Sequence, residues 1–386
     1  MQPYEVHFAR LFGNDYYAFG FWKARVALYA ILKALTLRPG DEVISPAYTC
    51  VVVPNSIRYT GATPVYADIA PGNYNVDPMS VERKITPRTR IVLAQHTYGI
   101  PADVETLQAV TEPRGLILIE DCAHVLLGST YRGKPMGSLG RAAFFSSQWS
   151  KPYTTGLGGM ALTRDPELAR RLKEIQSEIQ PPPRSKVLQL RLQYGLFRRF
   201  FRPQLYWRSQ AFLHKLSRLG LFVGSSNLTE LSGEKPTDFD WNMSAFQYRA
   251  GLAQLIKLEE NSAHRKNLTR YYLASLRDRH WPIENLPSDG ATLLRVPVAV
   301  QRKDELLDQA RSAGIELGSW FETPLHPLPL AQHTAINYMP GDCPVAESAA
   351  RHVVNLPLHE RVKHDDAEQV IQFILSHASP HALAMN

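Results

Sequence analysis

The chain has 386 residues, 44% hydrophobic and 20% charged, which is ordinary for a globular protein and long enough for two domains. Its cysteines, Cys50, Cys122 and Cys343, lie far apart without metal-ligand spacing, so we expect no disulfide framework, no metal site and a reducing compartment. No apolar stretch is as long as a membrane span, and the first residues, MQPYEVH, lack the pattern of a signal peptide. We therefore expect a cytoplasmic protein.

The first half of the chain alternates helical and strand-like patterns. Apolar residues at helical spacing predict a helix over residues 24–35, which Pro39-Gly40 ends. Short apolar segments predict strands over residues 42–44, 64–66, 91–94, 116–119, 142–145 and 160–162. Because helical or loop segments separate most of these strands, the pattern favours an α/β fold with a mostly parallel sheet flanked by helices.

The second half predicts a different unit. After a proline-broken helical region, a helix begins near Ser244. The tail then reads as strand 293–300, helix 304–313, strand 315–318 and helix 366–375. We expect a large domain over residues 1–235, with a helical insertion at about 180–229, and a smaller α+β domain over residues 236–386.

Chemically active side chains follow two of the predicted strands. Lys151 comes after strand 142–145 and before a glycine-rich turn, while Asp121 and His124 follow strand 116–119. Open parallel sheets bind ligands at the carboxyl ends of their strands. A lysine that forms a Schiff base and an aspartate that keeps a pyridinium nitrogen protonated are what a pyridoxal phosphate enzyme needs.

Taken singly, each of these residues has a structural explanation. Lys151 fits a solvated surface lysine, Asp121 a helix cap, His124 a core histidine and Ser146 a turn residue. Their order and spacing, rather than any one of them, carry the prediction.

Longer segments carry a resemblance over nearly the whole chain. They are RPGDEVISPAYT, GATPVYADIAPGNYNVDP, ITPRTRIVLAQHTYGIPADVETL, EDCAHVLLGSTYRGKPMGSLG and PGDCPVAESAARHVVNLPLH. Together they resemble the DegT/StrS family of pyridoxal-phosphate-dependent, fold-type I aminotransferases, which mostly act on nucleotide-linked keto sugars. The resemblance implies a fold-type I architecture and a homodimer with active sites at the interface.

The resemblance also implies roles for individual residues. Lys151 would be the Schiff-base lysine and proton carrier, Asp121 would pair with the pyridine nitrogen, and His124 would lie beside the ring. Ser146 would bind the cofactor phosphate.

The phosphate-binding Ser-Gly-Thr of the family is Lys23-Ala24-Arg25 here. Backbone amides at this helix start, near Ala24, would still hold phosphate, and Lys23 or Arg25 would add positive charge. Cys50 takes the place of an aromatic residue that often stacks on the ring.

Further departures affect the substrate side. Leu157 replaces an acid, and Trp320-Phe321 replaces a His-Tyr pair, so we expect a more apolar pocket. Asp240 and Asn242 replace an Asn and an Arg in a loop that family members lend to the neighbouring subunit. An aspartate would repel the phosphate, so we expect Asp240 to point away or the loop to be shifted.

A basic, aromatic-rich segment is a second clue. Residues 179–229 contain nine Lys or Arg and no Asp or Glu, so the rest of the chain carries a net charge of −2. A helical insertion with solvated cations explains this, and so does attachment of residues 184–222 to an anionic membrane. We do not expect nucleic acid binding, because no recognisable nucleic-acid-binding module accompanies the cations.

Together, the residues and the resemblance predict an aminotransferase. We expect glutamate as amino donor and, as acceptor, a nucleotide-linked keto sugar or a lipid-linked, amphiphilic carbonyl compound. A peripheral position on the inner face of the membrane follows if the basic segment binds lipid. Another pyridoxal phosphate reaction, such as dehydration, an acceptor such as a cyclitol or a cyclic aminobenzoate precursor, and a non-catalytic membrane-associated scaffold remain alternatives.

Overall fold

A seven-stranded sheet organises the larger part of the molecule. The computed structural model describes residues 2–201, 203–209, 230, 232–283, 286 and 290–383. The sheet order is β1-β10-β9-β6-β5-β2-β4. The strands are β1 (Tyr17–Phe21), β2 (Glu42–Pro46), β4 (Thr63–Ala67), β5 (Thr89–Gln95), β6 (Ile117–Cys122), β9 (Ala142–Ser146) and β10 (Gly159–Thr163).

Strand direction confirms the predicted sheet. The neighbouring pairs from β4 to β9 are all parallel, and β10 alone runs against both of its neighbours, β9 and β1. Consequently the carboxyl ends of β5, β6 and β9 lie at one edge of the sheet, where Gln95, Asp121 and Ser146 are found.

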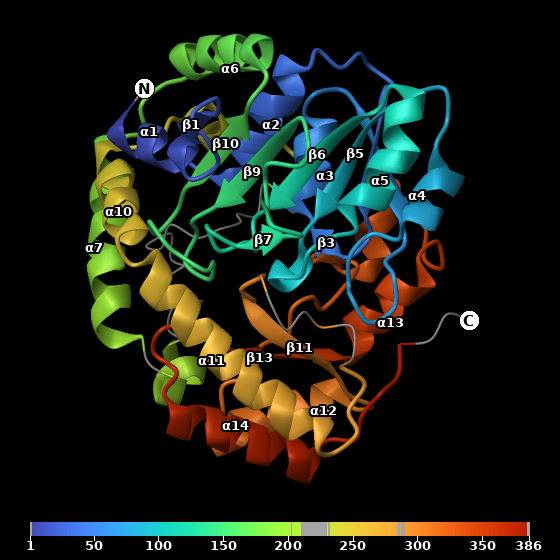
Figure 1. Ribbon diagram of the computed structural model, residues 1–386, viewed down its shortest axis with the longest axis vertical. Helices are drawn as coiled ribbons and strands as arrows, with labels where there is room; N and C mark the ends of the chain where they lie inside the picture. The colour runs from blue at the N-terminus through green and yellow to red at the C-terminus, as the bar shows by residue number, and fades with distance from the viewer. Residues whose placement is uncertain are drawn as a thin grey trace.

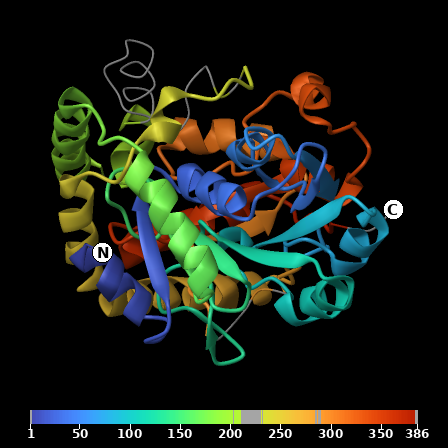
Figure 2. The same cartoon turned by 90° about the horizontal axis from the view of Figure 1, so that it is seen from above.

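Helices cover both faces of this sheet. One face packs against α2 (Ala24–Ala34), α3 (Val52–Arg58) and α6 (Pro166–Glu178), and α6 lies beside α2 in the view from above (Figure 2). The other face packs against α4 (Pro78–Lys84) and α5 (Val104–Thr111). Strand neighbours such as Val43 and Ile44 belong to opposite layers, as the alternation of a strand requires.

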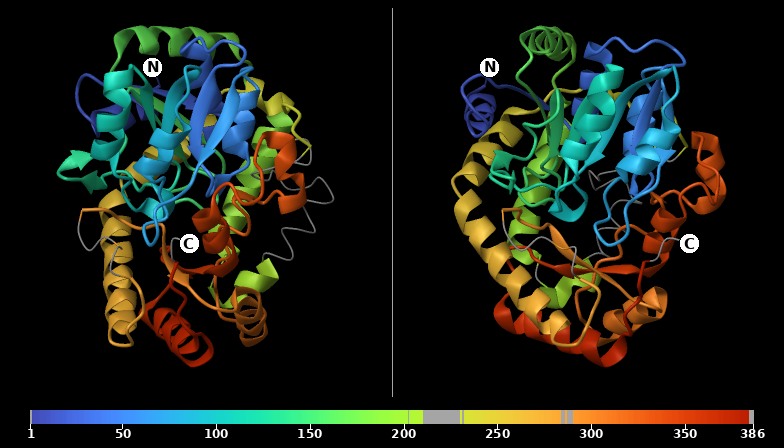
Figure 3. Two further views of the ribbon diagram at one scale, coloured as in Figure 1. Left: turned by 90° about the vertical axis from the view of Figure 1, so that its right-hand side faces the viewer. Right: turned by 45° about the vertical axis from the view of Figure 1, so that its right-hand side comes forward.

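A second, smaller layer lies beyond the carboxyl ends of the strands (Figures 1 and 3). Its antiparallel pair consists of β11 (Arg295–Ala299) and β13 (Val353–Pro357). The helices of this part are α11 (Leu258–Arg277), α12 (Lys303–Ala313), α13 (Pro344–His352) and α14 (His364–His377). They bury one apolar core together with β11 and β13.

Three helices lie along one side of the larger unit. The hydroxyl of Tyr248 in α10 (Ala245–Leu255) donates to Glu5 of α1 (Pro3–Arg10) at 2.9 Å, and both helices share an apolar cluster with β9 and β10. Helix α7 (Arg184–Phe200) lies beside α10, where Tyr194 and Phe246 pack edge to face (Figure 1). The division of the chain after residue 235 remains a prediction.

Short elements complete the fold. The parallel pair β3 (Thr49–Cys50) and β12 (Leu325–His326) joins the two units, and β7 (Thr130–Tyr131) pairs with β8 (Lys134–Pro135). The predicted strand 315–318 is wrong, because only Gly318 forms an isolated bridge, with Asn355. Among the described residues, every helix is too short or too polar to cross a membrane.

Candidate active site

Lys151 lies in the turn between β9 and β10, and this turn is held by its own hydroxyl groups. The Ser147 and Thr155 hydroxyls are 2.7 Å apart, and the Thr155 N–H donates to the Ser147 carbonyl at 2.9 Å. The pKa of Lys151 is lowered from 10.5 to about 8, chiefly by burial. Cys50 and Asp121 oppose this shift, and Arg295 and Arg25 add to it. A lysine with such a pKa has a neutral, nucleophilic fraction of about one-tenth at pH 7, far more than an ordinary lysine has.

Asp121 is the last but one residue of the neighbouring strand β6 and is buried. Its carboxylate accepts a hydrogen bond from the Ala123 N–H at 2.9 Å. Burial raises the pKa of Asp121 to about 6, against the opposing effects of Ala123, Lys151 and His96. A positive charge placed beside this carboxyl group would favour its ionised form.

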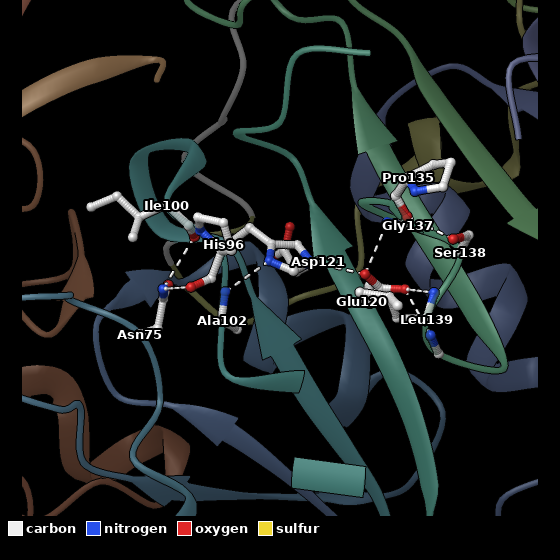
Figure 4. A network of polar contacts seen from close by, with 12 residues as sticks. Asn75, His96, Ile100, Ala102, Glu120, Asp121, Pro135, Gly137, Ser138 and Leu139 are labelled. Atoms are coloured by element: carbon white, nitrogen blue, oxygen red, sulfur yellow. Dashed lines mark hydrogen bonds and ion pairs between the residues drawn. The ribbon is translucent and has the colours of Figure 1, made fainter. Parts of the chain in front are cut away.

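A buried pair fixes the strand end that carries Asp121 (Figure 4). The His96 Nδ1 accepts from the Ala102 N–H at 3.0 Å, so Nε2 carries the proton and donates to Glu120 at 3.0 Å. Glu120 also accepts three backbone N–H groups, from Gly137, Leu139 and Gly140. Cys122 lies close enough to complete a three-ligand metal set, yet the histidine and carboxylate already have protein partners.

His124 presents an aromatic ring beside Lys151. Its Nδ1 accepts from the Tyr98 N–H at 3.1 Å, and its ring stacks on that of Trp320 with centroids 5.5 Å apart. Burial lowers the pKa of His124 well below its ordinary value, and Lys151 and Arg295 add to this effect. The imidazole is therefore neutral near pH 7.

The start of α2 carries the predicted phosphate residues. Gly159 of β10 allows this helix to approach, since a Cβ there would lie 2.4 Å from the Ala24 nitrogen. Ser146 is opposite Gly159 in the strand register, which places it near Ala24. Lys23 and Arg25 are both buried.

Carboxylates from one later segment neutralise both cations. The Lys23 Nζ lies 2.5 Å from Asp238, and Arg25 forms an ion pair with Glu230. Asp240, by contrast, is exposed and pairs with Lys235 at 3.1 Å. Asp240 therefore does not face the start of α2, where Asp238 lies instead.

Cys50 lies near both Lys151 and Arg25. Burial raises the pKa of its thiol, whereas Arg25 and Lys151 both lower it, so the sulfur lies within the field of both cations. The structure thus brings together Lys151, Asp121, Cys50 and Arg25.

One expected pocket residue lies elsewhere. Leu157 is fully buried against Trp22 and Leu190, so it adds nothing apolar to a substrate pocket. Asn242 also serves the fold, because its Nδ2 donates to the carbonyls of Gln176 and Ile179 at 2.8 and 3.0 Å. The apolar surface beside Lys151 comes from Trp320, whose ring centroid lies 4.7 Å from the Lys151 Nζ.

The donor set fits pyridoxal phosphate. Lys151 and Asp121 suit the aldehyde and the pyridine nitrogen, and His124 suits a ring face. Ala24 and Arg25 at the start of α2 suit the phosphate, which would compete with Glu230 for the guanidinium.

Some residues of the site gave no local sequence signal. Arg295 opens β11 and approaches the same Trp320 ring, 5.3 Å from its centroid. Lys303 is buried and donates to the carbonyls of Ser319, Phe321 and Ala350 at 2.8 to 3.0 Å. A lone cation at the edge of a strand or helix looks like an ordinary surface residue, and only the fold brings it inward.

Comparison with known proteins identifies the family. The profile of the DegT/DnrJ/EryC1/StrS aminotransferase family matches residues 1–194 and 208–375. The chain is 31% identical to a GDP-perosamine synthase of Caulobacter vibrioides over 353 residues, which span 89% of this chain and 81% of that protein. It is 28% identical to a dTDP-3-amino-3,4,6-trideoxy-alpha-D-glucose transaminase of Streptomyces venezuelae, over 97% of this chain and 86% of that protein.

A solved structure agrees. The S. venezuelae DesV structure with a ketimine intermediate has a TM-score of 0.75 and 27% identity, and the match covers 97% of this chain and 87% of that one. The fold, the donor set and the sequence matches agree over nearly the whole length. The chain belongs to the DegT/DnrJ/EryC1/StrS family of pyridoxal-phosphate-dependent aminotransferases, enzymes that act on small molecules.

Proposed function

We propose that this aminotransferase takes the amino group of glutamate and places it on a carbonyl carbon of a nucleotide-linked keto sugar. Glutamate would leave as 2-oxoglutarate, and the amine would replace the carbonyl oxygen of the acceptor. The names of the relatives, a GDP-sugar synthase and a dTDP-sugar transaminase, support a nucleotide-linked acceptor. The observation that carries the proposal is the placement of Lys151 and Asp121 at the carboxyl ends of neighbouring strands, in a chain with relatives named for nucleotide-linked sugars.

Each side chain has a defined task in this proposal. The bound cofactor would supply the electron sink. Lys151 would bind it and carry a proton at Nζ, because its pKa of about 8 permits both protonation states near neutral pH. Asp121 would ionise against the pyridine nitrogen, and the neutral His124 would offer a flat ring face.

The test uses the two half-reactions separately. Glutamate alone should yield one equivalent of 2-oxoglutarate per loaded site, and a nucleotide-linked keto sugar should then restore the starting absorbance. If glutamate yields 2-oxoglutarate but no nucleotide-linked keto sugar restores the absorbance, the acceptor belongs to the lipid-linked or cyclitol class instead. If no amino acid yields its 2-oxo acid, the result would favour the non-catalytic membrane-associated scaffold.

We propose further that the enzyme is a homodimer. The family resemblance supports it, since members share residues across the subunit interface. Light scattering on the purified protein should give twice the 43.5 kDa of the chain. A monomer with full activity would contradict this proposal.

We also propose that α7 attaches the enzyme to an anionic membrane surface. Its inner face packs through the buried Leu190 and Tyr194. Its outer face carries an apolar stripe at helical spacing, each side chain 55–61% exposed: Leu188, Leu192, Leu196 and Phe200. Cations and no carboxylate accompany the stripe within the helix: Arg184, Lys186, Arg191, Arg198 and Arg199.

This face suits a lipid surface. Apolar side chains enter the headgroup region, while each nearby cation gains about 1 kcal/mol from anionic lipid. Pairing of α7 with α7 of a second copy would set cations against cations. The rest of the proposed attachment segment, residue 202 and residues 210–222, lies outside the described residues.

Vesicle sedimentation tests the attachment. The protein should bind phosphatidylglycerol vesicles and not phosphatidylcholine vesicles, and Arg191→Gln/Arg198→Gln/Arg199→Gln should release it. A matched control removes three cations that pair with carboxylates elsewhere on the surface, Arg83, Arg114 and Arg302. Equal binding by both triple variants would count against α7.

A further inference from the structure

Arg295 is a cation of the site for which the described residues supply no carboxylate. It opens β11, opposite Pro357 of β13, and is half-buried. Its guanidinium carbon lies 5.3 Å from the Trp320 ring centroid, and the Lys151 Nζ lies 4.7 Å from the same centroid. Both cationic groups therefore border one indole ring.

The fold makes room for this side chain. A Cβ on Gly318 would lie 2.3 Å from the Arg295 Nη1, so a larger residue there would displace the guanidinium from this position. The guanidinium also donates a hydrogen bond to the Tyr206 hydroxyl oxygen. The indole and hydroxyl contacts restrict the planar group, and a restricted guanidinium favours bidentate recognition of an anion.

The charge balance of the site points in the same direction. Arg25 has Glu230 and Lys23 has Asp238, whereas Arg295 forms no ion pair within the part of the chain that the structure describes. Its positive charge also acts on both Lys151 and His124. Placing like charges around one site costs free energy unless a ligand brings the opposite charge.

We infer that Arg295 binds an oxyanion of the substrate beside Lys151, either a carboxylate of the amino donor or a phosphate of the nucleotide-linked acceptor. The inference rests on the proposed transamination, since that reaction supplies both anions. The guanidinium would form two parallel N–H···O bonds, stacked on Trp320. Arg295 is then a binding residue for one half-reaction.

Two unreactive probes separate the sources. Glutarate is a dicarboxylate without an amino group, and inorganic pyrophosphate stands for the nucleotide-linked group. Binding of each to the cofactor-loaded enzyme is measured from the change in cofactor absorbance, for the wild type, Arg295→Gln and Arg295→Lys. The control is Arg302→Gln, an exposed arginine of the same unit.

We expect Arg295→Gln to lower the affinity for one probe by about 10- to 100-fold, because a charged bidentate contact is lost. Arg295→Lys should recover only part of this binding, and Arg302→Gln should change nothing. Weaker glutarate binding assigns the site to the donor, and weaker pyrophosphate binding assigns it to the acceptor. Unchanged affinity for both probes would overturn the inference.

A second variant guards against a folding defect. Gly318→Ala keeps Arg295 but forces its guanidinium to move, so it should weaken the same probe. Arg295→Gln should also raise the pH midpoint of Lys151, because a nearby cation is removed. Probe binding needs no turnover, so it tests Arg295 even if glutamate is not the donor.

Discussion

At Lys151, burial and neighbouring charge act on one amine. Burial, Arg295 and Arg25 destabilise the ammonium form, and Cys50 and Asp121 only partly compensate. Arg295 enters from β11 of the smaller unit, so the reactivity of the lysine depends on the closed arrangement of both units. The side chain that carries the chemistry and the side chains that tune it are far apart in the sequence.

A pH titration tests this account of Lys151. Because its pKa is lowered from 10.5 to about 8, the amine becomes neutral as the pH rises through 8. The rate at which the apo-protein takes up pyridoxal phosphate should therefore rise with pH and level off above a midpoint near 8. A midpoint above 10 would show a solvated lysine, which contradicts the enclosed site.

The Arg25–Glu230 pair occupies the place expected for the cofactor phosphate. Both groups are buried, and Glu230 also lies within the field of Cys50. A phosphate bound at the start of α2 would pair with the Arg25 guanidinium in place of Glu230. The carboxylate would then serve as a counter-ion that stabilises the apo-protein.

Glu230→Gln tests this exchange. The substitution leaves Arg25 buried without its carboxylate. Because a buried ion pair that loses one partner destabilises a protein strongly, the free energy of unfolding should fall by about 3–5 kcal/mol. Added phosphate or pyridoxal phosphate should recover part of the loss, because an anion that binds only the folded state stabilises it. The measurement is urea unfolding with and without each anion.

The matched control is Glu82→Gln, which breaks the exposed Arg114–Glu82 pair. It should change the urea midpoint little, because surface ion pairs contribute little. If phosphate fails to stabilise Glu230→Gln more than the wild type, Arg25 is not a phosphate ligand.

At the scale of elements, the segment between α12 and β12 determines what faces Lys151. Lys303, the first residue of α12, donates to three carbonyl groups, two of them in residues 319–321. The Trp320 N–H donates to Asn355 of β13 at 2.9 Å. The indole over Lys151 is therefore fixed from its backbone.

Lys303→Met should destabilise the protein by about 2–4 kcal/mol, because it leaves buried carbonyl groups without donors. It should also lower the affinity for the probe that Arg295 binds, because the backbone on either side of Trp320 loses its hydrogen bonds to Lys303. Thermal unfolding and probe titration measure the two effects. Arg302→Met, one residue away and exposed, should leave both unchanged.

The sequence predicted the larger elements well. Strand β6 and helix α2 were found from apolar periodicity, and their ends were placed within three residues of the structure. Strands β1 and β13 were not predicted. The segment Tyr17–Phe21 is short and contains Gly20, so its pairing with β10 comes from the tertiary fold rather than from a local pattern.

At the scale of the molecule, the site is built from both units. The sheet places Lys151 and Asp121 at one edge, and the smaller unit lies beyond that edge (Figures 1 and 3). Trp320 of the smaller unit borders Lys151, and Arg295 borders the same indole ring. Sequence order and spacing were enough to predict that Lys151 and Asp121 lie close together. They could not predict that Glu230 would reach Arg25, a pairing across 205 positions that depends on how the whole chain folds.

One measurement tests the central claim most directly. The absorbance of the purified protein with pyridoxal phosphate is recorded before and after addition of glutamate, beside Lys151→Ala. The account predicts a visible band in the wild type that glutamate bleaches, and no such band in Lys151→Ala. A wild-type protein that stays colourless with added cofactor, or a band that survives in Lys151→Ala, would contradict the account.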